Sequence, residues 1–99
     1  MFKRVLIANR GAIATRIIRT LKKLGIQSIV VYHEKDQDSL HVQLADIAVN
    51  LGAGAVSDTY LNQTKILEIA LAENADAIHP GYGFLSENST FVDRCESLG

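Results

Sequence analysis

The chain alternates between short apolar runs and longer segments in which apolar residues recur at helical spacing. The runs are typical of strands buried on both faces of a parallel sheet, and they lie within residues 3–8, 28–32, 47–51 and 77–79. The predicted helices are residues 12–24, 40–45, 62–73 and 90–98. This alternation predicts an α/β fold: a Rossmann-like three-layer domain with a mainly parallel sheet of about four strands.

Two of the predicted helices are amphipathic. The apolar stripe predicted for the first consists of Ile13, Ile17, Leu21 and Leu24. The apolar face predicted for the third consists of Ile66, Leu67, Ile69, Ala70 and Leu71. Gly25 is expected to end the first helix, because glycine adopts the left-handed conformation that closes a helix at no steric cost. Ser39 is the candidate N-cap of the second.

The composition, 47% hydrophobic and 21% charged over 99 residues, is that of one soluble globular domain. No apolar run approaches the roughly 20 residues of a membrane-spanning helix, so no membrane association is expected. The first apolar run also falls short of the roughly 7 to 15 residues of a signal peptide core. A lone cysteine, Cys95, fits a reducing compartment, and we expect a cytoplasmic protein. Acids on either side of Cys95 do not favour a reactive thiolate.

The charges are segregated along the chain. Residues 1–33 hold seven basic side chains and no acidic one, whereas residues 34–99 hold three basic and eleven acidic side chains. Such a field suggests that the N-terminal surface meets an anion or an acidic partner, the alternative being a solvated helix face. Nucleic-acid binding is not expected, because no aromatic residues are interleaved with these basic residues.

The loop formed by Asn9, Arg10 and Gly11 lies between a predicted strand and a predicted helix, where backbone amides and the helix dipole favour anions. A dinucleotide site would need the pattern G-x-G-x-x-G, of which only Gly11 is present. Glu34 lies about 20 residues further on, where a ribose-binding acid would stand, but it is weak support by itself. The three histidines are too far apart in sequence to predict a metal site, since no two lie three or four residues apart.

Residues 77–88 form the most informative segment. Pro80 keeps the strand that ends at His79 from continuing as a helix. Gly81 and Gly83 permit backbone conformations closed to other residues, and they flank Tyr82, which can offer a ring and a hydroxyl to a ligand. The alternative is that Tyr82 only caps the core.

Four segments together resemble the N-terminal domain of biotin carboxylases, which precedes the ATP-grasp module in biotin-dependent carboxylases. They are residues 6–14 with 16–20, residues 24–26 leading to 31–32, residues 41–42 with 45–46, and residues 77–88. The last reads Ala-Ile-His-Pro-Gly-Tyr-Gly-Phe-Leu-Ser-Glu-Asn. Many members have glutamate after Arg-Gly where this chain has Ala12. Alanine there, with the sequence Asp-Thr-Tyr-Leu at residues 58–61, is similar to the urea carboxylase branch.

The resemblance implies that bicarbonate is activated by ATP and Mg²⁺ and that its carboxyl group passes to biotin on a carrier domain. It implies that the catalytic residues, the metal ligands and the ATP site lie in a downstream ATP-grasp domain, so this segment holds no catalytic residue and no metal. It places Tyr82, Gly83, Glu87 and Asn88 on the biotin side of the cleft and Asn9, Arg10 and Gly11 in the strand-end loop. Arg16 and Arg19 lie on a helix at the dimer interface of some members.

Residues 1–99 are accordingly expected to be one domain, a fragment of a longer multidomain carboxylase. The carboxyl acceptor could be urea or, alternatively, acetyl-CoA, another acyl-CoA or pyruvate. Two readings of other classes remain open: a stand-alone nucleotide-binding Rossmann domain, and a non-enzymatic interaction module that uses the basic helix.

Overall fold

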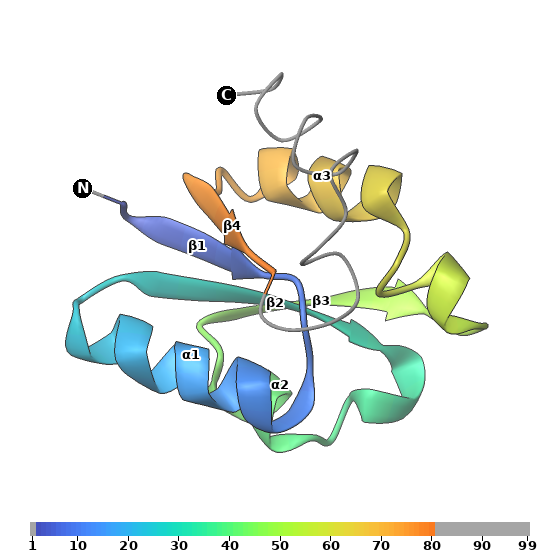
Figure 1. Ribbon diagram of the computed structural model, residues 1–99, viewed down its shortest axis with the longest axis horizontal. Helices are drawn as coiled ribbons and strands as arrows, with labels where there is room; N and C mark the ends of the chain where they lie inside the picture. The colour runs from blue at the N-terminus through green and yellow to red at the C-terminus, as the bar shows by residue number, and fades with distance from the viewer. Residues whose placement is uncertain (1, 81–99) are drawn as a thin grey trace.

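The computed structural model describes residues 2–80 of the chain (Figure 1). Its centre is a sheet of four strands in the order β3-β2-β1-β4, in which every neighbouring pair is parallel. The strands are β1 (Arg4–Ile7), β2 (Gln27–His33), β3 (Ile47–Gly52) and β4 (Ala77–His79). The predicted four-stranded parallel sheet is confirmed.

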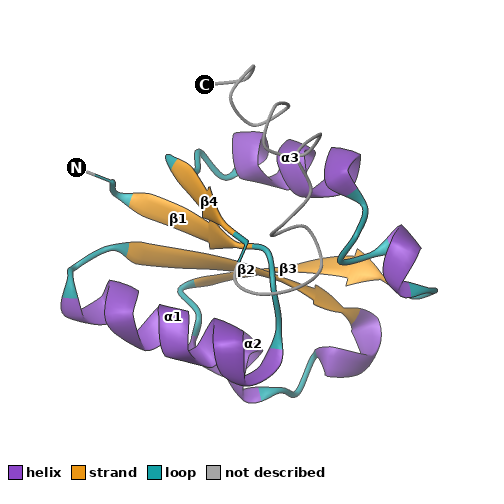
Figure 2. Ribbon diagram, viewed as in Figure 1, coloured by secondary structure: helices purple, strands orange, loops and turns teal. Residues whose placement is uncertain are grey.

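Helices cover both faces of the sheet (Figure 2). The helix α1 (Gly11–Lys23) and the short helix α2 (Leu40–Leu44) lie on one face, and α3 (Gln63–Ala72) lies on the other. Two 3-10 helices, η1 (Glu34–Asp36) and η2 (Val56–Asp58), shape the loops after β2 and β3. Three layers result, as the sequence predicts, and η1 lies between the predicted strand at residues 28–32 and the predicted helix at residues 40–45.

The core has two halves, because successive strand residues point to opposite faces of the sheet. Leu6 and Ile29 belong to the half under α3, whereas Ile7 and Val30 belong to the half under α1. All four side chains are fully buried. This two-sided burial explains why the strands read as unbroken apolar runs.

The buried faces of the helices differ from the predicted stripes, because Ile13 and Ile17 are only partly buried and two predicted leucines are exposed. On α1 the buried apolar residues are Ala14, Ile18 and Leu21, while Leu24 is 63% exposed. On α3, Leu71 is likewise exposed. Leu24 misses the core because α1 ends at Lys23 and Leu24 is only its C-cap.

The predicted end of α1 is confirmed. Gly25 has a φ of +73° and donates its N–H to the carbonyl of Lys22, while Ile26 donates to Leu21. These two bonds form a Schellman motif, which satisfies carbonyls that the helix leaves unpaired. Ser39 precedes α2 as predicted, but its hydroxyl donates to the carbonyl of Asp36 instead of capping the helix.

Two aspartates fix the amino-terminal ends of the strands. Asp76 accepts the backbone N–H groups of Lys3 and Arg4 at 2.7 and 2.9 Å, which joins β4 to β1. Asp46 accepts the N–H of Ser28 at 2.8 Å, which joins β3 to β2. The backbone N–H donors hold the pKa of the Asp76 carboxyl below its usual value.

Within residues 2–80, no helix combines the length and the apolar character needed to cross a membrane. The predicted helix at residues 90–98 lies outside the described residues.

Candidate functional site

The carboxyl ends of the four strands meet at one edge of the sheet, where open α/β folds bind ligands. Asn9 follows β1 at this edge and is 3% exposed. Its Nδ2 donates to the carbonyl of Pro80 at 2.8 Å, and its Oδ1 accepts the N–H of Arg10 at 2.9 Å. Ala8 also donates its N–H to the carbonyl of His79 at 2.9 Å. The loop after β1 is therefore bonded directly to the start of the loop after β4.

Arg10 links this loop to the one after β2. Its Nε and Nη2 donate to the two carboxylate oxygens of Asp36 at 2.9 and 2.8 Å. The Arg10 side chain is 47% exposed and that of Asp36 17%. A planar guanidinium that binds both carboxylate oxygens fixes direction as well as distance.

Tyr60, in the segment between η2 and α3, completes the cluster. Its hydroxyl donates to Oδ2 of Asp36 at 2.7 Å and accepts the backbone N–H of His33 at 3.1 Å. The ring is almost fully buried, and the guanidinium carbon of Arg10 lies 6.0 Å from its centroid. One aromatic residue thereby supports both charged partners.

The protonation states follow from these contacts. Hydrogen bonds from Arg10 hold the pKa of the Asp36 carboxyl below its usual value, so this group stays a carboxylate near neutral pH. Burial raises the pKa of the Tyr60 hydroxyl to about 12, so Tyr60 keeps the proton that it donates.

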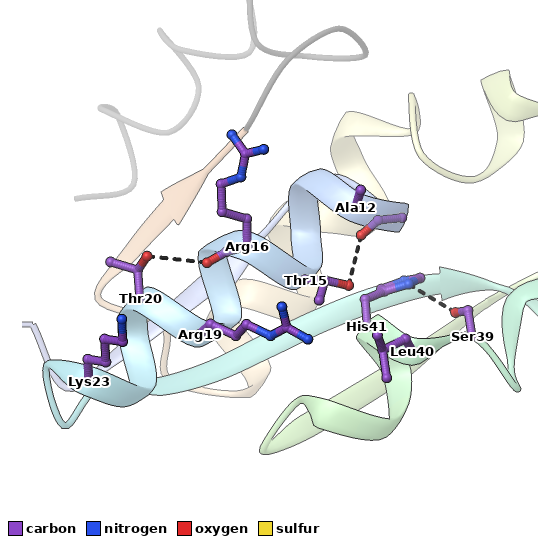
Figure 3. Close-up of a pocket in the computed structure, with 10 residues that line it drawn as sticks. Ala12, Thr15, Arg16, Arg19, Thr20, Lys23, Ser39, Leu40 and His41 are labelled. Carbon is purple, nitrogen blue, oxygen red and sulfur yellow. Dashed lines mark hydrogen bonds between the residues drawn. The ribbon is translucent and has the colours of Figure 1, made fainter.

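A second feature is an open cleft of about 680 Å³ between α1 and α2 (Figure 3). Gly11 lies at its end near the strand-end loop, and Arg16, Arg19 and Lys23 contribute positive charge from α1. Ser39 and His41 contribute from the other wall. The cleft and the strand-end loop thus meet at Gly11, whose φ of +64° favours glycine.

His41 is the buried histidine of this wall, with 1% of its surface exposed. Its Nδ1 lies 2.9 Å from the hydroxyl of Ser39. Burial lowers the pKa of the His41 imidazole, because a buried ring loses the hydration that stabilises its charged form.

We expect the stability of the 99-residue chain to fall as the pH drops below about 6.5, the pKa of an unfolded histidine. The unfolded chain takes up the proton first, so the stabilisation present above that pH is lost as the pH approaches the lower pKa of folded His41. Urea unfolding between pH 7.5 and 5.5 measures this slope. His41→Gln should flatten it. Equal slopes in the parent and in His41→Gln would contradict the assignment.

The predicted site residues that the structure describes lie in two places. Asn9, Arg10 and Gly11 lie together at the strand ends, and Arg16 and Arg19 line the cleft with Gly11. The biotin-side residues Tyr82, Gly83, Glu87 and Asn88 lie outside the described residues, as does Cys95. Glu34, the acid considered for a ribose, is exposed at the start of η1.

Asp36 and Tyr60 are not among the predicted site residues. One signal for Asp36 is its position three residues after β2, because parallel strands end at the same edge of the sheet. Within residues 2–80, no three His, Cys, Asp or Glu side chains are grouped so that they could hold a metal ion. What the described residues offer beside this edge is the positive charge of Arg16, Arg19 and Lys23 along the cleft, which suits binding and positioning.

Comparison with known proteins identifies relatives over the full chain. The family described as biotin carboxylase, N-terminal domain, matches residues 1–99. Biotin carboxylase 1 of Bacillus subtilis (strain 168) is 54% identical over 98 residues, which are 99% of this chain and 22% of that protein.

Two crystal structures share the fold. The Kluyveromyces lactis urea carboxylase has a TM-score of 0.96 and 52% identity, over 98% of this chain and 9% of that one. The biotin carboxylase domain dimer of the Hydrogenobacter thermophilus 2-oxoglutarate carboxylase, in complex with MgADP, ADP and bicarbonate, has a TM-score of 0.96 and 52% identity, over 100% of this chain and 22% of that one. The chain therefore spans less than a quarter of each relative.

Proposed function

This chain belongs to the family of biotin carboxylase N-terminal domains, and we propose that it is the first domain of an ATP-dependent carboxylase that carboxylates biotin. The observation that carries the proposal is the match to this family over residues 1–99. The fold supports it, since the chain shares a TM-score of 0.96 with a biotin carboxylase domain that was crystallised with MgADP and bicarbonate.

In the proposed reaction, ATP activates bicarbonate as carboxyphosphate, and the carboxyl group then passes to the ureido nitrogen of biotin. The cofactors are biotin, ATP and Mg²⁺, held mainly by a downstream ATP-grasp domain, and the biotin is presented by a carrier domain. The short share of each relative that this chain covers supports such a longer enzyme. We place the enzyme in the cytoplasm, and the single cysteine among these 99 residues supports this placement.

The proposed acceptor of the carboxyl group is urea. Ala12 and the sequence at residues 58–61 support it through their similarity to the urea carboxylase branch. The likeness to the K. lactis urea carboxylase is compatible with this acceptor but does not select it, since the 2-oxoglutarate carboxylase domain has the same identity, 52%.

Within the first domain, we assign Tyr82, Gly83, Glu87 and Asn88 to the biotin side of the cleft. Asn9, Arg10 and Gly11 form the strand-end loop beside it, and Asn9 supports this assignment through its bond to the carbonyl of Pro80. Arg16 and Arg19 are assigned to an interface, supported by their position along the cleft of α1.

The test is an assay of the full-length enzyme. We expect it to cleave ATP only when bicarbonate is present and to transfer ¹⁴C from bicarbonate to free biotin. The 99-residue chain alone should do neither, because its sequence contains no phosphate-binding lysine loop and no carboxylate pair for magnesium. The proposal is refuted if the pure 99-residue chain cleaves ATP in the presence of bicarbonate. It is also refuted if the full-length enzyme shows no bicarbonate-dependent ATP cleavage.

A further inference from the structure

We propose that the cleft between α1 and α2 binds an extended, acidic segment of another protein chain. The inference deepens the assignment of Arg16 and Arg19 to an interface, and to that extent it rests on the proposed function. It names the chemistry of the partner: carboxylate side chains that meet α1, alternating with apolar side chains that meet Leu40 on the opposite wall.

The wall that α1 forms is basic. Arg16, Arg19 and Lys23 line the cleft, and all three residues are exposed. Their spacing of three and four residues places them on one side of the helix. Among the described residues, no acidic side chain lines the cleft, and α1 itself contains none. The cleft therefore carries a concentrated positive charge.

This charge is not neutralised within the described part of the chain. Over residues 2–80 the one ion pair joins Arg10 to Asp36, and no side-chain hydrogen bond is made by Arg16, Arg19 or Lys23. A solvated helix face usually carries acids three or four residues from its bases, which form pairs along the helix. Because α1 has no such acids, its three cations are available to a partner.

The wall on the side of α2 has a different character. Leu40 lines the cleft and is 51% exposed, whereas His41 is buried and its Nδ1 lies 2.9 Å from the hydroxyl of Ser39. Leu40 is thus the large apolar contact that this wall offers. Figure 3 shows Arg19 extending from α1 toward this wall. One wall suits carboxylates and the other suits an apolar side chain.

The dimensions favour an extended chain over a single small anion. From Arg16 to Lys23 the helix rises about 10 Å, at 1.5 Å per residue. An extended segment covers this distance in about three residues, and its successive side chains point in opposite directions. Acids at alternate positions can then face α1 while the residues between them face Leu40. A single phosphate group has no such reach.

A second copy of this chain is a poor occupant if it uses the same helix. Two α1 surfaces brought together would place like charges opposite one another, a juxtaposition that costs several kcal/mol. The complementary surface must be acidic, which the basic face of α1 is not.

The test measures binding of a fluorescein-labelled peptide of alternating glutamate and leucine to the full-length enzyme by fluorescence anisotropy. We expect binding that weakens as the salt concentration rises, and none by the same peptide with glutamine in place of glutamate. Replacing both arginines, Arg16→Gln with Arg19→Gln, should weaken binding roughly tenfold, about threefold for each exposed charge pair. Leu40→Ala should weaken it roughly threefold through lost apolar contact.

Lys22→Gln with Lys35→Gln is the matched control. It removes the same net charge from two exposed lysines that do not line the cleft. We expect binding within about twofold of the parent, because charges further from the peptide are screened by salt. Both double variants should unfold at the temperature of the parent, since all four positions are exposed.

Four results would overturn the inference. The peptide does not bind the parent enzyme, or the two double variants lose affinity equally, which would mean only a general attraction of charge. Tripolyphosphate binds as tightly as the peptide and loses affinity in the same arginine variant, which would assign the cleft to a small polyanion. The enzyme sediments as a dimer that the arginine variant converts to a monomer, which would make a second copy the occupant.

None of these measurements uses carboxylation, so each of the four results leaves the proposed function standing. A full-length enzyme without bicarbonate-dependent ATP cleavage would refute the proposed function whether or not the peptide binds.

Discussion

Replacing Leu6 by alanine should lower the free energy of unfolding of the 99-residue chain by about 2–5 kcal/mol. Leu6 is fully buried on the central strand β1, in the half of the core that α3 covers. Neighbouring strands on both sides prevent β1 from moving inward to fill the space, so most of the cavity should persist. Domains of this size have only about 5–15 kcal/mol of stability. Urea denaturation followed by circular dichroism measures the loss.

Leu24→Ala is the matched control, since it removes the same atoms from a leucine that is 63% exposed. The helical pattern of the sequence places Leu24 in the core, and the structure places it at the C-cap of α1. We expect a change within about 0.5 kcal/mol, as for most surface positions. A loss at Leu24 as large as that at Leu6 would mean that the sequence pattern is right and the described packing wrong.

The strands could be predicted from the sequence because their environment leaves a simple signal. In β1, Val5, Leu6 and Ile7 are all buried. Helices cover both faces of the sheet, and β1 has a neighbouring strand on each side, β2 and β4. A continuous apolar run is the direct consequence. The α1 stripe is less certain from sequence, because Ile17 and Ile18 are adjacent and helical spacing alone does not decide which of them faces the sheet. In the structure Ile18 is buried and Ile17 only partly so.

The site could be predicted only where its residues are neighbours in the sequence. Asn9, Arg10 and Gly11 follow a predicted strand, and the chemistry of such a loop is recognisable. Asp36 and Tyr60 are 24 residues apart, and Arg10 and Asp36 are 26 apart. Their meeting depends on the turn of η1 and on the path of the chain between η2 and α3, which no short sequence pattern encodes.

Tyr82→Ala should lower kcat/KM for free biotin by roughly thirtyfold in the full-length enzyme, the size expected when an aromatic contact worth about 2 kcal/mol is lost. The sequence predicts that Pro80, Gly81 and Gly83 set the local backbone without help from the tyrosine ring, so the substitution should cost little stability. ATP cleavage without biotin should survive, because the ATP site is assigned to the downstream domain. Steady-state kinetics with varied biotin and thermal unfolding of the same sample provide both measurements.

Tyr60→Ala supplies the comparison for a tyrosine that does belong to the core. Tyr60 is 2% exposed and packs against β-strand and α3 residues, so its truncation should cost about 3–5 kcal/mol. If Tyr82 only capped the core, Tyr82→Ala would resemble Tyr60→Ala in stability and would leave the Michaelis constant for biotin unchanged. Tyr82→Phe separates ring from hydroxyl: full recovery of biotin use would assign the contact to the ring face, and a value equal to that of Tyr82→Ala would assign it to the hydroxyl.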